Sequence, residues 1–235
     1  PEYFSVDKDG NPDTSQLNFA NPELADQVVR DILAWHKGDV RDENGMKRMR
    51  SVIDDIFGVV PMDNRNWSHD PQTQALLLDE PTRTIGGFNT NRASRYLFQF
   101  VNEIATRVAK QAPDITISAL AYAGYYFPPK GMTFPDNVSV MVCKQHVKAR
   151  TVKHDAAYYD SLREWRKKVG SLYVWEYYNF PLWRKWNVFP GIVPKRIGHD
   201  MAKMKEIGVD GEFIEYNTAK GFPYPTPRGA PPISG

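Results

Sequence analysis

The feature that most constrains the fold of this chain is the alternation of short apolar runs with amphipathic helical runs. Six runs are strand-like, and most of them are apolar on successive residues rather than at every second position. Such strands are typical of a parallel sheet covered by helices. We therefore predict strands at residues 16–19, 55–60, 115–122, 138–143, 171–177 and 211–215.

The helices between these strands are marked by their apolar spacing and by their end signals. The first is expected to begin at Asn21 as the cap, with Pro22 and Glu23 in its first turn, and to end at Gly38. The clearest amphipathic pattern covers residues 92–111. Further helices are predicted at residues 158–169 and 196–207.

The fold class that follows is α/β, and two architectures remain open. Six strands are fewer than the eight that close a (β/α)₈ barrel of the TIM type. Periodicity alone does not separate an incomplete barrel from a doubly wound sheet. The chain has no G-x-G-x-x-G after a strand and no Walker motif, so nucleotide-binding sheets lose support. The loop at residues 62–91 is long for a compact domain, and such loops are usually functional or mobile.

Composition and charge argue against several classes of binding partner and cofactor. The formal net charge is +2, from 30 basic and 28 acidic residues without a strongly basic stretch, so nucleic acid is not expected as a partner. No apolar run is long enough for insertion into a membrane. Cys143 is the only cysteine, which excludes a disulfide framework and a Cys-rich zinc site. The pairs His69–Asp70 and His199–Asp200 lack further ligands at suitable spacing, so no metal or other cofactor is predicted.

Acidic residues at strand ends are the candidates for chemistry, because a parallel barrel forms its active site where the strands end. Asp63 follows the strand at 55–60, Glu176 lies at the end of the strand at 171–177, and Glu215 ends the last strand. Glycoside hydrolysis needs two carboxyl groups on either side of one bond. The alternative is that each acid is solvated or anchors a loop.

Aromatic residues, 13% of the chain, suit a sugar ligand because rings stack on the C–H faces of pyranoses. The alternative is that these rings pack in the core or at the sheet rim. The predicted substrate-binding residues lie at strand ends or just beyond them. They are Asn64, Trp67, Tyr122, His146, Trp175 and Tyr177.

Several segments occur in an order and at a spacing that resemble one known family. In order they are PEYFSVDKDG, QLNFANPEL, VVPMDN, RASRYLFQFVNEIATRVAKQAPDITISALAY, FPDNVSVMV, LYVWEYYNF and MKEIGVDGEFIE. The chain resembles the bacterial family labelled domain of unknown function 4838 over residues 1–216. The resemblance implies a TIM-barrel domain similar to family 67 α-glucuronidases and family 20 hexosaminidases.

The resemblance also implies a wider context. Such domains lie in larger, often secreted or periplasmic, bacterial proteins, behind an N-terminal α/β domain. Residues 1–216 would then be a partial barrel without its first two strands, and the N-terminal part of the same protein would be its partner. Residues 217–235 would form a Pro/Gly-rich tail. An open seam exposes apolar strand edges, so the isolated piece is expected to aggregate.

Site residues are carried over from the family pattern. Asp63 matches the acid after strand four, Glu176 matches the V-W-D/E-Y segment of strand seven, and Glu215 matches the acid that ends strand eight. The resemblance thus implies that Asp63 is the general acid and Glu176 the nucleophile or base. Glu215 is the reserve candidate, which could exchange roles with Glu176. The family's cysteine after the strand-four acid is missing from residues 66–72.

The leading hypothesis is a glycoside hydrolase that acts on poly- or oligosaccharides with two carboxylates. The alternative is a glycan-binding barrel domain without catalysis, and a third hypothesis is a metal-assisted hydrolase. Two carboxyl groups that face one cleft would favour the hydrolase. Acids buried in ion pairs would favour the binding domain, and three or more N/O ligands around one point would favour the metal enzyme.

Overall fold

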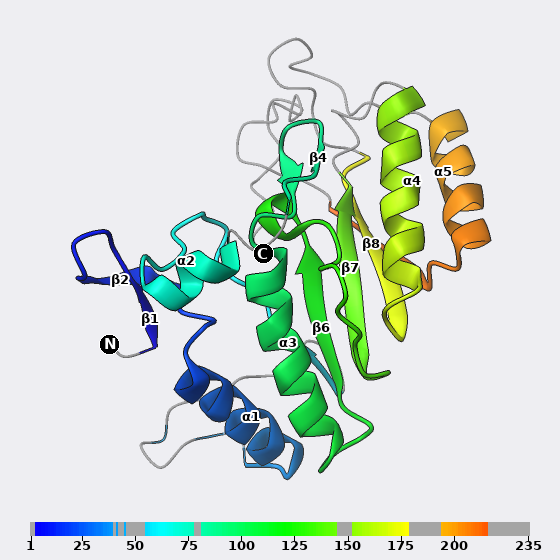
Figure 1. The fold of residues 1–235 in the computed structure, drawn as a ribbon. Helices are drawn as coiled ribbons and strands as arrows, with labels where there is room; N and C mark the ends of the chain where they lie inside the picture. The colour runs from blue at the N-terminus through cyan, green and yellow to red at the C-terminus, as the bar shows by residue number, and fades with distance from the viewer. Residues whose placement is uncertain are drawn as a thin grey trace, which may run out of the picture.

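A five-stranded parallel sheet forms the centre of the protein (Figure 1). The computed structural model describes residues 3–39, 41, 45, 55–77, 81–144, 152–178 and 194–215. The strands, in sheet order, are β3 (Ile56–Gly58), β6 (Thr116–Ala121), β7 (Val138–Lys144), β8 (Ser171–Glu176) and β9 (Gly211–Ile214). Every neighbouring pair is parallel. Because sheet order follows chain order, the sheet lacks the reversal point of a doubly wound sheet, and it curls as half of a barrel does.

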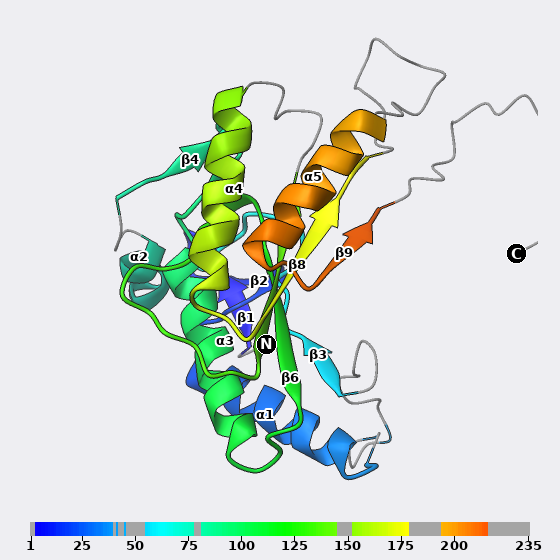
Figure 2. The same ribbon diagram turned by 90° about the vertical axis from the view of Figure 1, so that its right-hand side faces the viewer.

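The main helices lie on one side of this sheet (Figures 1 and 2). Helix α3 contacts β6, and α4 contacts both β7 and β8. Helix α1 packs on α3, and α5 packs on α4. The bounds are α1 (Pro22–His36), α3 (Ser94–Ala109), α4 (Val152–Arg166) and α5 (Pro194–Ile207). None of the helices in the described ranges is long and apolar enough to cross a lipid bilayer.

The end signals predicted for the first helix are confirmed. The side chain of Asn21 accepts a hydrogen bond from the backbone N–H of Glu23 at 2.9 Å, and Pro22 occupies the first turn. Gly38 has a φ of +86°, the left-handed conformation that favours glycine after a helix. These local signals set the bounds of α1 without help from the rest of the fold.

The two sides of the sheet differ in burial because successive strand residues point to opposite sides. Side chains on the helix-covered side are fully buried, and they are Ile117, Ala119, Val140, Val142, Leu172 and Val174. Burial of a large apolar side chain contributes roughly 1.5–3 kcal/mol. Side chains on the other side are partly exposed and include Leu120, Met141, Tyr173 and Trp175. We call this second side the open face.

The strand predicted at residues 16–19 does not belong to the parallel sheet, so that prediction is wrong. Instead β2 (Pro12–Leu17) pairs antiparallel with β1 (Phe4–Val6) in a separate two-stranded sheet. Most residues of β2 are polar, and three of its six residues are exposed, so it lacks the apolar surface that a strand inside the parallel sheet must bury. The carboxylate of Asp7 accepts the backbone N–H groups of Asp9 and Asn11 and closes the turn between the two strands.

The segment predicted as a long loop contains short elements. They are α2 (Pro71–Leu77) and the hairpin of β4 (Thr84–Ile85) and β5 (Asn89–Thr90). A short 3₁₀ helix, η1 (Ala123–Tyr125), follows β6. The predicted helices at 92–111 and 196–207 are confirmed with small shifts, whereas α4 begins six residues before the predicted position 158 (158 − 152 = 6). The tail at 217–235 lies outside the described residues.

Candidate functional site

Two of the predicted acids, Asp63 and Glu215, lie beyond the carboxyl ends of strands and influence the same two tyrosines. Burial is the main cause that raises the pKa values of Tyr122, just after β6, and Tyr177, just after β8. The negative charges of Asp63 and Glu215 raise both pKa values further. Asp63 follows β3 and Glu215 follows β9, the two edge strands of the sheet, so both acids lie at its carboxyl end but not on neighbouring strands.

Trp175, Tyr177 and Phe213 form an aromatic platform beside these acids. The Trp175 and Tyr177 rings stack with centroids 6.3 Å apart, and the Phe213 ring meets Trp175 edge-on at 4.6 Å. Tyr177 follows Trp175 by two residues, and Phe213 is the register partner of Trp175, so all three side chains share one side of the sheet. The indole N–H of Trp175 donates a hydrogen bond to the Glu215 carboxylate at 2.9 Å. These contacts form an aromatic surface with the Glu215 carboxylate at its edge.

A second aromatic group continues from Tyr122. Its ring meets those of Phe88 and Tyr125 edge-on, at 5.5 and 6.3 Å. Trp67 contacts Tyr125 at 6.1 Å and the fully buried Tyr96 at 5.7 Å. Trp67 therefore packs partly against the core, and it connects to Tyr122 through Tyr125.

Asn64 and Gln16 hold the segment that carries Asp63. The Asn64 carbonyl oxygen accepts a hydrogen bond from the Gln16 side chain at 3.1 Å, and its amide donates to the Ser15 backbone oxygen at 2.8 Å. The Gln16 side chain also donates a hydrogen bond to the backbone oxygen of Met62 and accepts one from its N–H, each at 3.2 Å. These contacts fasten the exposed Asp63 segment to β2. The role of Gln16 was missed in the sequence, where residues 16–19 were assigned to the parallel sheet.

The third predicted acid, Glu176, lies on the helix-covered side. It is adjacent to Trp175 in β8, so the two side chains point to opposite sides of the sheet. Glu176 and its register partner Lys144 are 0% and 1% exposed, and Lys144 Nζ lies 2.9 Å from Glu176 Oε1. The other Glu176 oxygen accepts the backbone N–H of Tyr177 at 3.0 Å. The structure therefore separates Glu176 from Asp63 and Glu215.

Lys144 and Glu176 belong to a larger buried charge network, which also contains Asp200, Arg196 and Tyr159. Lys144 Nζ donates to Asp200 at 2.6 Å. Asp200 also accepts hydrogen bonds from the Tyr159 hydroxyl and from Arg196 Nε, the latter at 3.1 Å. These residues come from β7, β8, α4 and α5, so the network joins two strands to the helices that cover them. No sequence pattern indicates this network, because partners such as Lys144 and Asp200 are 56 positions apart.

The surroundings of Glu176 favour the neutral carboxyl group more strongly than water does for an exposed glutamate. Burial raises the pKa of Glu176 to about 7, while the adjacent Lys144 charge acts in the opposite direction. The ion pair with Lys144 favours the charged carboxylate, but the effect of burial is larger, because the carboxyl group has no contact with solvent. The pKa of Glu176 is therefore raised.

Burial likewise raises the pKa of the Cys143 thiol, so Cys143 is not an activated nucleophile. His146, predicted to bind substrate, lies outside the described residues.

The fold defines the chain as an α/β protein built on a parallel half-barrel, with acids and aromatic rings gathered where its strands end. A family model described as a domain of unknown function (DUF4838) matches residues 1–224. The chain therefore belongs to this family, as its resemblance predicted. Searches of curated proteins and of solved structures each gave no match.

Proposed function

We propose that the protein is a glycoside hydrolase that acts on poly- or oligosaccharides at the carboxyl ends of its strands. The observation that carries this proposal is the aromatic platform at the carboxyl end of the sheet, where Trp175 stacks on Tyr177 and donates a hydrogen bond to the Glu215 carboxylate. Partly exposed rings next to carboxylates suit a ligand with apolar ring faces and a hydroxyl rim. The half-barrel sheet fits one part of a (β/α)₈ barrel, whose active sites form at this end.

In this proposal the carboxyl pair is Asp63 and Glu215. Asp63 is the general acid that protonates the leaving glycosidic oxygen, and Glu215 is the nucleophile or the base that activates water. The hydrogen bond from Trp175 to Glu215 orients the carboxylate next to the ring on which the sugar stacks. Glu176, first expected as the nucleophile, acts from the other side of β8 by holding the backbone of Tyr177.

The second candidate function is glycan binding without catalysis. The observation in its favour is that Glu176, the acid matched to the strand-seven position, is buried in an ion pair with Lys144. A screen of the protein against aryl glycosides and uronic-acid oligosaccharides separates the two functions. Release of reducing sugar supports the hydrolase, whereas saturable binding without any turnover supports the binding domain. Absence of both binding and turnover across the screen would contradict both proposals.

Trp175→Ala is expected to weaken binding of the glycan found in that screen by roughly 1–3 kcal/mol, the range for loss of a buried aromatic contact. The reason is that the indole supplies both the stacking surface and a hydrogen bond to Glu215. Calorimetric titration of the folded variant measures the change. Met201→Ala is the control, because Met201 is an exposed apolar side chain on α5. Equal affinities of the two variants would show that Trp175 only packs at the rim.

A further inference from the structure

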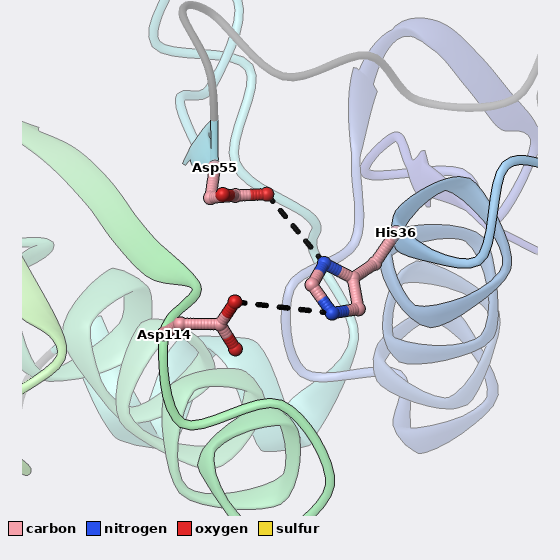
Figure 3. A group of neighbouring side chains, drawn as sticks. All are labelled: His36, Asp55 and Asp114. Atoms are coloured by element: carbon pink, nitrogen blue, oxygen red, sulfur yellow. Dashed lines mark ion pairs between the residues drawn. The ribbon is translucent and has the colours of Figure 1, made fainter.

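We propose that His36, Asp55 and Asp114 bind a divalent metal ion of the zinc class at the amino end of the sheet (Figure 3). His36 is the last residue of α1, Asp55 directly precedes β3, and Asp114 lies in the turn between α3 and β6. One potential ligand atom from each residue lies within 4.8 Å of the others. The three donors thus converge from three separate parts of the chain.

The imidazole of His36 lies between the two carboxylates (Figure 3). Its Nδ1 is 3.5 Å from Asp55 Oδ1, and its Nε2 is 3.9 Å from Asp114 Oδ2. Both distances exceed those of good N–H···O hydrogen bonds, which are about 2.7–3.2 Å. Within the ranges that the structure describes, the imidazole forms these two long ion pairs with the carboxylates and no hydrogen bond with them. A bound divalent cation would replace these long pairs.

Backbone hydrogen bonds hold the segments of Asp55 and His36. The backbone oxygen of Asp55 accepts the N–H of Thr116 at 2.9 Å, which joins the starts of β3 and β6. The last turn of α1 holds His36, since the Lys37 N–H bonds the Leu33 oxygen at 3.3 Å. Zinc binding requires the three donor atoms, now within 4.8 Å of one another, to close to Zn–N and Zn–O distances of about 2.0–2.2 Å.

The local electrostatics favour a cation at this position. Two carboxylates contribute negative charge, and the carboxyl ends of α1 and α3, which carry negative partial charge, point toward the same end of the sheet. One imidazole nitrogen with carboxylate oxygens suits zinc and similar first-row ions, whereas calcium and magnesium prefer all-oxygen sites. The side chains are 31%, 50% and 60% exposed, so water can complete the coordination.

The site lies far from the acids on the open face. It is at the amino ends of β3 and β6, whereas Asp63 and Tyr122 follow the carboxyl ends of the same strands. A strand as long as β6, at about 3.3 Å per residue, separates the two ends by roughly 20 Å. The metal would therefore act structurally, by fastening α1 to the sheet, and it lends no support to a metal-assisted hydrolase. The inference is independent of the proposed function.

Titration of the chelator-treated protein with zinc chloride tests the inference. Calorimetry should show one zinc ion per chain whose affinity falls about tenfold or more in His36→Asn and in Asp114→Asn, in line with the cost of disturbing a metal site. His69→Asn is the matched control, because His69 is an exposed histidine outside the cluster. Zinc should also raise the melting temperature of the wild type and of His69→Asn, and it should not do so in the two cluster variants.

Two outcomes would overturn the inference. One is zinc binding that is as tight in His36→Asn and Asp114→Asn as in the wild type, which would place the ion elsewhere. The other is no zinc binding by the wild type, with the same loss of melting temperature in His36→Asn whether zinc or chelator is present. That result would show that a protonated His36 is itself the cation between the two aspartates. If His36→Asn does not fold, the exposed Asp114→Asn variant still decides the matter.

Discussion

Replacement of Lys144 by methionine is expected to destabilise the protein by about 3–5 kcal/mol, the cost of removing one partner from a buried ion pair. Methionine retains much of the lysine stem but leaves the buried carboxylates of Glu176 and Asp200 without the ammonium group between them. Urea unfolding of the variant and the wild type measures the difference. The loss is large because neither carboxylate can reach water.

Two controls isolate this effect. Lys203→Met breaks an exposed ion pair with Glu206 and should change the stability by less than about 1 kcal/mol. The double variant Lys144→Met, Glu176→Gln should recover part of the loss, because a neutral amide then replaces the buried carboxyl group that lost its ammonium partner, whereas Asp200 keeps Arg196. A single Lys144→Met variant as stable as Lys203→Met would show that the buried charge network does not stabilise the fold.

Asp63→Asn and Glu215→Gln are each expected to lower kcat by about 10²–10⁴-fold, the usual contribution of a general acid or base. Both side chains lie at the solvent-accessible end of the open face, so their replacement should leave the unfolding free energy nearly unchanged. Steady-state kinetics on the glycoside found in the screen measure the loss. If Glu215 is a nucleophile, azide should rescue Glu215→Ala, in which the shorter side chain leaves space for the anion, and give a glycosyl azide product.

The matched comparison is with two other acids. Glu176→Gln should reduce stability more than turnover per folded molecule, because Glu176 lies on the helix-covered side. Asp160→Asn, at an exposed acid of α4, should change neither property. If Glu215→Gln keeps wild-type turnover while folded Glu176→Gln loses it, the catalytic partner of Asp63 is Glu176.

The sequence predicted the sheet better than it predicted the hairpin near the amino end. The runs that became β6, β7 and β8 are apolar on the covered side except at the last residues of β7 and β8, Lys144 and Glu176, and this pattern is visible without a structure. Residues 16–19 contain apolar Leu17 and Phe19, which suggested a strand of the same kind. The preceding polar residues of β2 and the turn closed by Asp7 decide its antiparallel pairing.

The candidate site was predicted in part. Strand position identified Asp63, Glu215, Tyr122 and the aromatic pair of β8, which all lie at one end of the sheet. Period-two alternation requires Trp175 and Glu176 to point to opposite sides, but it does not say which side the helices cover. Which side the helices cover is set by contacts between distant segments. Asp200 of α5 and Tyr159 of α4 join the network around Lys144 and Glu176 only in the folded chain. The position of Glu176 therefore could not be read from its own segment.

The proposed glycan site on the open face is tested most directly by locating a bound glycan on the protein. Nuclear magnetic resonance titration with the glycan selected in the screen should shift the signals of Trp175, Tyr177 and Tyr122, the aromatic residues around Asp63 and Glu215 on the open face. Residues on the helix-covered side and His36 at the amino end of the sheet should remain unchanged. Shifts confined to the helices or to the amino end, with the open face unaffected, would contradict glycan binding at the carboxyl ends of the strands.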